Sequence, residues 1–265
     1  MTDFGFIGCG HMGSVLAGIA ASDKKNSVYI SDSDAERVAA RAKEFGAKAA
    51  SNAQIAKECR YIVLCVRPQD LGSVCKEISQ YISARNDVTV INIAVGITLQ
   101  RTKELLNITD APVIRMMPNT PLSVSKGVIL YSTSNVRSED ESVFKKTFGV
   151  AGKLYSIPEE LMDAAGCISG CGPAFVYKFI DAFAKAGVEI GLPDHLAFSL
   201  ALKTIEGAVK MAEVSSLSPK ELCAQVCSKG GTTEAGVKII EGSDFENIMT
   251  ETVQASLKRT IELKS

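Results

Sequence analysis

Three glycines near the start of the chain constrain its fold more than any other feature. Gly8, Gly10 and Gly13 have the spacing G-x-G-x-x-G, after the apolar run at residues 4–7 and before a helix-favouring run at 15–20. In such a turn the first glycine lets the chain leave a strand sharply, the second lets a pyrophosphate approach the backbone, and the third lets the helix lie close to the sheet. The phosphates then bind free N–H groups at the helix start. An ordinary glycine turn is the alternative. A second predicted strand at residues 27–32 favours a dinucleotide site with contacts from Gly8, Gly10, His11, Met12 and Gly13.

Composition limits the remaining possibilities. The 265 residues are 46% hydrophobic and 22% charged, which is typical of a globular protein with a large core. A formal net charge of −1 gives no electrostatic reason to expect nucleic acid or a membrane surface as a partner. The sequence shows neither an apolar run of the ~20 residues that a membrane span needs nor a signal-peptide pattern. We therefore expect a cytoplasmic enzyme.

The eight cysteines do not indicate a metal site. Cys167 and Cys171 are four residues apart, as are Cys223 and Cys227, so each pair could share one face of a helix. Structural zinc sites usually use tighter C-x-x-C spacing, and a reducing compartment keeps thiols free. We expect free thiols throughout and no metal.

Elements alternate over the first part of the chain and then change in character. Strands are predicted at residues 27–32, 60–66, 87–93, 112–115, 127–131 and 153–156, with helices at 34–45, 71–82, 98–106 and 139–148 between them. This alternation predicts an α/β fold with a doubly wound sheet over residues 1–157. From residue 158 to 265 the pattern is helical, with helices predicted at 158–168, 172–188, 193–214, 218–226, 232–241 and 244–263. Their broad apolar faces are typical of a subunit interface.

The end of the second predicted strand bears on the choice of cofactor. Asp32 lies nineteen positions after Gly13, where an acid usually binds the ribose hydroxyls of NAD(H). Ser31 and Ser33 could instead bind the extra phosphate of NADP(H), and Arg37 lies one helical turn further on. A third interpretation is that Asp32 only caps the following helix. The sequence leaves the choice between NAD(H) and NADP(H) open.

Three further segments have the composition of ligand-binding loops. Residues 117–121 (Met-Pro-Asn-Thr-Pro) follow a predicted sheet strand, and residues 169–175 form a glycine-rich entry to a long helix. Residues 228–235 place two glycines and two threonines at a helix start, which offers N–H and hydroxyl donors to an anion the size of a carboxylate. A plain turn, a helix-packing turn and a helix cap are the respective alternatives.

These motifs together resemble the pyrroline-5-carboxylate reductase family over essentially the full length of the chain. The resemblance is carried by the opening glycine turn, by Val66-Arg67-Pro68-Gln69, by residues 117–121 and by residues 226–235. It implies a Rossmann domain followed by an all-helical dimerisation domain, with dimers that often assemble into decamers of five dimers. It also implies reduction of L-1-pyrroline-5-carboxylate to L-proline by a nicotinamide cofactor, the last step of proline biosynthesis.

The resemblance also implies roles for particular residues. The substrate carboxylate would bind at Ser228, Gly230, Gly231, Thr232 and Thr233. The nicotinamide side of the site would be lined by Asn119 and by the loops that contain Val66, Arg67, Pro68, Ala94 and Gly96. Asn119 and Ser169 are candidates for orienting the reactants, and no catalytic acid or base is identified.

Four positions depart from the family pattern. Lys229 stands where the family usually has proline, and Cys171 and Phe175 stand where it has serine and tyrosine. Gly166 replaces a threonine whose hydroxyl has been suggested to contact the ring nitrogen, so no side chain at this position can supply the imine proton. A cyclic iminium needs only a hydride at its ring carbon, and orientation and electrostatics can supply most of the acceleration.

Two other functions compete with this interpretation. A β-hydroxyacid dehydrogenase would have a lysine four residues after Gly172, where this chain has Val176. Lys178 comes two residues later and lies about 200° further round a helix. A catalytically inactive relative with a regulatory role is the second alternative, and the intact sequence at residues 230–233 argues against it.

Overall fold

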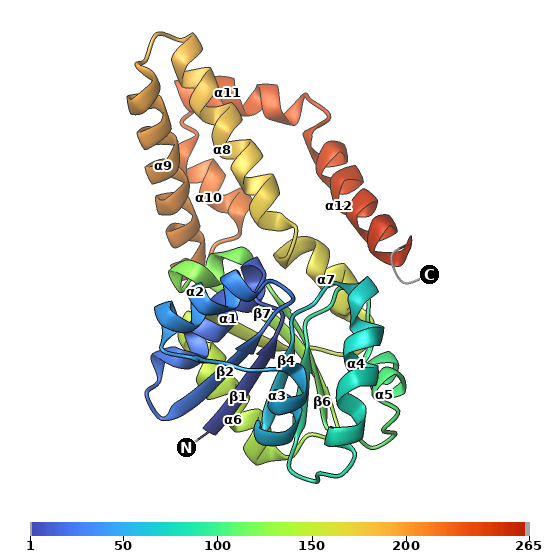
Figure 1. The fold of residues 1–265 in the computed structure, drawn as a ribbon. Helices are drawn as coiled ribbons and strands as arrows, with labels where there is room; N and C mark the ends of the chain where they lie inside the picture. The colour runs from blue at the N-terminus through green and yellow to red at the C-terminus, as the bar shows by residue number, and fades with distance from the viewer. Residues whose placement is uncertain (1, 263–265) are drawn as a thin grey trace. The chain divides into compact units, whose positions relative to one another are not determined.

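The computed structural model describes residues 2–262, which form two compact units (Figure 1). One unit contains the residues up to Cys171 together with those from Ser256 onward, and the other is Gly172–Ala255. The predicted boundary after residue 157 falls at the end of the last strand rather than at the division between these units. That domain boundary stays a prediction.

The first unit is built on one eight-stranded sheet within the described residues, in the order β3-β2-β1-β4-β5-β6-β7-β8. The strands are β1 (Thr2–Ile7), β2 (Asn26–Ser31), β3 (Lys48–Ala49), β4 (Tyr61–Leu64), β5 (Thr89–Asn92), β6 (Val113–Pro118), β7 (Gly127–Ser134) and β8 (Gly152–Ser156). All neighbours are parallel except β6 and β7. That pair is antiparallel because a short 3-10 turn, Thr120–Val124, joins it in place of a crossover helix.

Helices cover both faces of the sheet, as Figure 1 shows. One face carries α1 (His11–Ser22), α2 (Ala35–Phe45) and α6 (Ser138–Phe148), and the other carries α3 (Asn52–Glu58), α4 (Pro68–Ile82) and α5 (Leu99–Leu106). The apolar run of β4 serves both cores, because Tyr61 and Val63 pack on the first face and Ile62 and Leu64 on the second. This confirms the doubly wound fold.

Local signals set the ends of several helices where the sequence predicts them. Asp34 caps α2 by accepting a hydrogen bond from the Arg37 N–H at 3.0 Å, and Gly46 ends the helix with a φ of 67°. Ser51 and Thr98 cap α3 and α5 in the same way. The boundaries of these elements therefore follow from the sequence.

A buried charge network ties β4 to α6 at the amino ends of the strands. The Asp140 side chain is fully buried and accepts hydrogen bonds from the Tyr61 hydroxyl at 2.6 Å and from Arg60 Nη2 and Arg137 Nε, both at 2.7 Å. Two guanidinium groups and a phenol thus satisfy one buried carboxylate. The network lies at the opposite ends of the strands from the glycine turn.

No strand occurs among the described residues after 157. In the first unit a 3-10 turn, Glu159–Leu161, leads into α7 (Met162–Ser169), so the helix predicted from residue 158 begins four residues later. The second unit contains α8 (Gly172–Glu189), α9 (Asp194–Val214), α10 (Pro219–Val226), α11 (Thr232–Glu241) and the start of α12 (Phe245–Glu262). The predicted end of the last helix, residue 263, lies outside the described residues.

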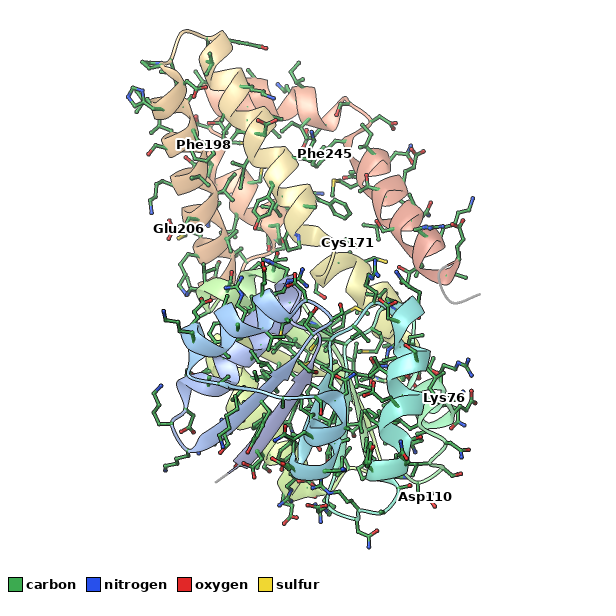
Figure 2. The ribbon with its side chains drawn as sticks, viewed as in Figure 1. Lys76, Asp110, Cys171, Phe198, Glu206 and Phe245 are labelled. Atoms are coloured by element: carbon green, nitrogen blue, oxygen red, sulfur yellow. The ribbon has the colours of Figure 1, made fainter. Side chains whose placement is uncertain are left out.

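The second unit leaves many large apolar side chains exposed. Figure 2 marks two of them, Phe198 on α9 and Phe245 at the start of α12, which are 50% and 43% exposed. Phe179 and Phe183 on α8 form a ring pair that is similarly exposed. An apolar surface of this kind is typical of an interface between subunits.

None of the helices within residues 2–262 has both the length and the apolar character that crossing a bilayer requires.

Candidate active site

The glycine turn has the geometry that its spacing predicts. Gly8 has a φ of 102°, and a Cβ there would lie 2.8 Å from the Cys65 carbonyl carbon. A Cβ on Gly13 would overlap the Gly8 carbonyl oxygen, so this glycine allows α1 to approach β1 closely. A Cβ on Gly10 would meet no protein atom within 4 Å. The space beside Gly10 is therefore open to a ligand, and the turn fits a pyrophosphate at the start of α1.

Asp32, directly after the neighbouring strand β2, stabilises this turn through a hydrogen bond. Its carboxylate accepts hydrogen bonds from the Cys9 N–H at 2.6 Å and from the Asp34 N–H at 3.0 Å, and Arg37 Nη1 lies 3.2 Å away. Burial alone would raise the pKa of Asp32, but the two amide hydrogen bonds and the Arg37 charge hold it below its usual value. The carboxylate is therefore ionised at neutral pH and fixes the backbone between Gly8 and Gly10.

A cleft of about 900 Å³ opens beside the turn, at the carboxyl ends of the strands. Residues that the sequence assigns to the cofactor line it: Gly8, Gly10, Ser31, Asp32, Ser33, Val66 and Arg67. His11 lines a separate hollow of about 420 Å³ on α1 instead. Met12, Gly13, Pro68, Ala94, Gly96 and Asn119 are not among the residues that line the cleft. The structure thus brings these seven residues together in one cleft. Their contacts with the cofactor, on the adenosine and on the nicotinamide side, stay predictions.

The cleft also contains residues that sequence reasoning missed. The Ser31 hydroxyl donates to Asn52 Oδ1 at 2.7 Å, and Asn52 Nδ2 donates to Glu77 Oε2 at 2.8 Å. All three side chains line the cleft. Asn52 follows the cap residue Ser51 at the start of α3, and a polar side chain at a helix start is the local signal that could have identified it.

Asn119 holds α7 against the sheet. Its Nδ2 donates to the Ser169 carbonyl at 2.9 Å and its Oδ1 accepts from the Val128 N–H at 2.8 Å, so both ends of the buried amide are engaged within the first unit. The Ser169 hydroxyl is buried and has no hydrogen-bond partner among residues 2–262. The two candidates for orienting the reactants are therefore joined to each other through the Ser169 backbone.

Two residues of β6 also contact α7. Arg115, only 3% exposed, pairs with Asp163 at 2.6 Å and with Glu159 at 3.3 Å. Met117 fills the space beside Gly166, where an added Cβ would overlap its sulfur atom. Residues 115, 117 and 119 alternate along one side of an extended segment, so β6 and the residue that follows it contact α7 at three points. The thioether of Met117 therefore occupies the place that a side chain at position 166 would take.

The loop after β5 is fixed by hydrogen bonds of the Asn92 side chain. Asn92 Oδ1 accepts from the Ala94 N–H at 2.9 Å, while Asn92 Nδ2 donates to Thr102 Oγ1 at 2.8 Å. Gly96 then turns the chain with a φ of 78°. The predicted contacts at Ala94 and Gly96 therefore belong to an ordered loop at the carboxyl end of a sheet strand.

The glycine–threonine loop lies in the second unit and leads into α11. Gly230 has a φ of 74°, and Gly231, rather than either threonine, is the N-cap of the helix. Thr232 and Thr233 therefore begin the helix, where first-turn N–H groups have no intrahelical acceptor. This places amide and hydroxyl donors at one helix start, as an anion site requires.

One acidic side chain already contacts this loop. Glu234 Oε2 accepts a hydrogen bond from the Gly230 N–H at 2.9 Å and lies 3.4 Å from Lys238 Nζ. A carboxylate thus binds at the loop even without a ligand. A ligand carboxylate bound at this loop would either replace Glu234 at Gly230 or use the donors of residues 231–233.

The cysteines have free thiols, and four of them (Cys9, Cys59, Cys75 and Cys167) are buried. Burial raises the pKa of Cys9 to about 11, and that of Cys59 and that of Cys75 each to about 12. These thiols are protonated at neutral pH. Within residues 2–262 no three His, Cys, Asp or Glu side chains cluster in a way that could hold a metal ion.

The open glycine turn, the cleft at the strand ends and the helical second unit define a dinucleotide-binding oxidoreductase of the Rossmann class. Residues 159–263 match the family described as pyrroline-5-carboxylate reductase dimerisation, and residues 3–96 match NADP oxidoreductase, coenzyme F420-dependent. The chain is 36% identical to pyrroline-5-carboxylate reductase 3 of Danio rerio over 98% of this chain and 90% of the relative. It is 33% identical to the Escherichia coli pyrroline-5-carboxylate reductase over 98% and 97% of the two chains. The chain belongs to the pyrroline-5-carboxylate reductase family.

Solved structures agree with this assignment. The Plasmodium falciparum pyrroline carboxylate reductase with NADP bound has a TM-score of 0.87 at 30% identity, covering 100% of this chain and 98% of that one. The Coxiella burnetii reductase has a TM-score of 0.89 at 26% identity, covering 100% and 99%. A 3-hydroxyisobutyrate dehydrogenase from Mycobacterium tuberculosis, 11% identical with a TM-score of 0.54 over 82% of this chain and 72% of that one, shares the fold alone. This likeness supports a shared fold and gives no support to the β-hydroxyacid dehydrogenase alternative.

Proposed function

We propose that this protein reduces L-1-pyrroline-5-carboxylate to L-proline with NADPH or NADH. One observation carries the proposal. A donor-rich loop of two glycines and two threonines begins α11, in a chain whose first unit has an open dinucleotide turn at Gly10. Relatives that span nearly the whole chain are named as pyrroline-5-carboxylate reductases.

The first unit would bind the cofactor, and a reduced nicotinamide supplies a hydride when bound. The Gly10 turn would hold the pyrophosphate through N–H groups at the start of α1. Asp32 keeps that turn in shape through its bond to the Cys9 N–H. Arg37, with Ser31 and Ser33, could bind a 2′-phosphate, whereas the Asp32 charge disfavours one. Both cofactors therefore belong to the proposal.

The second unit would bind the substrate through its carboxylate. Amide groups at residues 231–233 and the Thr233 hydroxyl would donate to it, and the positive end of the α11 dipole would add to the attraction. Fixing the carboxylate fixes the orientation of a small rigid ring, and orientation is a large part of what this reaction needs. Gly166 supplies no hydroxyl, and Met117 fills its place, so the imine nitrogen takes its proton from elsewhere.

We further propose that two copies associate through the second unit, with five dimers forming a decamer, and that the protein is cytoplasmic. Supporting the dimer are the exposed rings of α8 and α9 and the match of residues 159–263 to a dimerisation family. Free thiols on all eight cysteines are the usual state in a reducing compartment.

A cofactor-oxidation assay tests the activity. The purified protein is mixed with L-1-pyrroline-5-carboxylate and either NADPH or NADH, and the loss of reduced cofactor is followed together with the formation of proline. We expect one proline per cofactor oxidised. Cofactor oxidation without proline, or inactivity with both cofactors, would contradict the proposal and favour a catalytically inactive relative.

A further inference from the structure

Two thiols lie one helical turn apart directly before the glycine–threonine loop. Cys223 is exposed on α10, and Cys227 is the half-buried residue that ends this helix. The Cys227 N–H donates to the Cys223 carbonyl at 3.2 Å, which stacks the two residues on one face. Burial and a hydrogen bond with the Cys223 thiol raise the pKa of Cys227. The two sulfur atoms are therefore neighbours.

Cys227 is mechanically connected to the start of α11. With φ −87° and ψ 90° it has already left the helical conformation, and Ser228 follows it. The Ser228 carbonyl accepts from the Gly231 N–H at 2.9 Å, and Ser228 Oγ occupies the space where a Cβ of Gly231 would lie. A displacement of Cys227 therefore moves Ser228 and the N-cap of α11.

Joining the two thiols requires such a displacement. Residues four apart on a helix have Cβ atoms roughly 5–6 Å apart, whereas a disulfide holds its Cβ atoms at about 3.5–4.5 Å. Cys223 is fixed inside α10 by helical hydrogen bonds, so the residue that moves is Cys227. Lys229, unlike proline, does not restrict φ, and the loop can follow.

We propose that Cys223 and Cys227 are a thiol–disulfide modification site. A small disulfide of the glutathione class oxidises the pair to an intramolecular disulfide, which weakens binding of the substrate carboxylate at residues 228–233. The second part rests on the proposed function, whereas disulfide formation itself does not.

The chemistry is two successive thiol–disulfide exchanges. The exposed Cys223 thiolate attacks a sulfur of glutathione disulfide, which forms a mixed disulfide and releases one glutathione thiolate. The Cys227 thiolate then attacks the Cys223 sulfur, which forms the internal disulfide and releases the second. Two protein thiols are oxidised, one glutathione disulfide is reduced, and the two thiol protons end on two glutathione molecules.

The other cysteine pair with this spacing provides the control. Cys167 is 1% exposed, and its thiol donates to the Asp163 carbonyl at 3.2 Å inside α7. An attacking thiol must be accessible to the reagent. Cys167 and Cys171 therefore should not form a disulfide under conditions that oxidise Cys223 and Cys227.

Peptide mapping tests the site directly. Trypsin should release residues 221–229 as one peptide, which contains Cys223 and Cys227 and no other cysteine. The full-length protein is incubated with glutathione disulfide, unreacted thiols are alkylated, and the peptide is weighed without reduction. We expect the unalkylated peptide, lighter by two hydrogen atoms than its dithiol form. A glutathione adduct alone, or a doubly alkylated peptide, would overturn the proposal.

Kinetics test the consequence on the same samples. Oxidation should raise KM for the imine about tenfold or more, leave KM for the cofactor unchanged, and be reversed by dithiothreitol. Cys223→Ser should have the imine KM of the reduced protein, and oxidation should no longer change it. In Cys171→Ser, oxidation should still raise the imine KM. An oxidised pair with an unchanged imine KM, or a response that persists in Cys223→Ser, would overturn the control of substrate binding. Inactivity of the fully reduced protein would instead refute the proposed function, and the peptide map would still decide the site.

Discussion

The Asp32 carboxylate accepts a 2.6 Å hydrogen bond from the backbone N–H of Cys9, so the residue that follows β2 stabilises the glycine turn that follows β1. The same carboxylate faces Arg37 at 3.2 Å. One side chain thus shapes the pyrophosphate turn and sets the charge beside the ribose. Its two effects on the cofactor can be separated by substitution.

Asp32→Asn should shift preference towards NADPH, because it removes the negative charge beside a 2′-phosphate and keeps an acceptor for the Cys9 N–H. The expected change in the ratio of the two kcat/KM values is a few-fold to about a hundredfold, the range for one charge contact. Asp32→Ala also removes the brace, so kcat/KM should fall with both cofactors. An unchanged ratio in Asp32→Asn would mean that Asp32 only holds the glycine turn through the Cys9 N–H and does not set the cofactor preference.

Gly10→Val should abolish cofactor binding without unfolding the protein. A Cβ at this position would meet no protein atom within 4 Å, so the folded structure should tolerate the substitution. The side chain would instead occupy the space that the pyrophosphate of the cofactor needs. Titration of the cofactor and a melting curve measure the two effects. Gly72→Ala, whose Cβ would be at an ordinary 3.8 Å from Leu105, is the control and should bind normally. Retained affinity in Gly10→Val would refute the assignment of the turn.

Thr233→Ala should weaken binding of the imine and spare the cofactor. A charged acceptor that loses one hydrogen bond loses roughly 1.5–3 kcal/mol, which is about one to two powers of ten in KM. Because Gly231 is the N-cap, loss of this hydroxyl should hardly change the melting temperature. Thr250→Ala on α12 is the matched control. A lower melting temperature with a normal KM would mean that Thr233 stabilises the helix and that the carboxylate binds elsewhere.

Asp140 should dominate the loss of stability in acid. Burial alone would raise its pKa, but hydrogen bonds from Tyr61, Arg137 and Arg60 hold it below the usual value. Its contribution is therefore full above the unfolded pKa of about 3.9 and is lost as the pH falls through the lower folded value. Asp140→Ala should cost about 1–3 kcal/mol of unfolding free energy at pH 7, because it leaves the buried Tyr61 hydroxyl without its acceptor, whereas Arg60 keeps its contact with Glu139. Urea unfolding measures this, and a loss below about 1 kcal/mol would show that the network is not stabilising.

Local chemistry determined most of what the sequence could predict. The glycine spacing, the helix predicted at residues 34–45 and the apolar run of β4 each depend on signals within a few residues, and the structure has each of them at the predicted place. The two-residue strand β3 was missed, because Lys48 and Ala49 have no strand pattern and are ordered only by pairing with β2.

Contacts between distant residues could not be predicted. The hydrogen bond from Asn119 to the Ser169 carbonyl joins residues fifty positions apart in the sequence. The ion pair of Arg115 with Asp163 joins residues forty-eight positions apart. The family resemblance implies that Asn119 lies beside the nicotinamide of the cofactor. Its amide connects two segments of the first unit, which no local pattern indicates, and its contact with the cofactor stays a prediction.

Isotope transfer tests the central claim most directly. The protein is given L-1-pyrroline-5-carboxylate and reduced cofactor that carries deuterium in the transferred position of the nicotinamide ring, and the proline formed is examined by NMR. We predict one deuterium at the former imine carbon of each L-proline molecule, equal in amount to the cofactor oxidised. Proline without deuterium at that carbon, or no proline at all, would contradict the assignment of this chain as a pyrroline-5-carboxylate reductase.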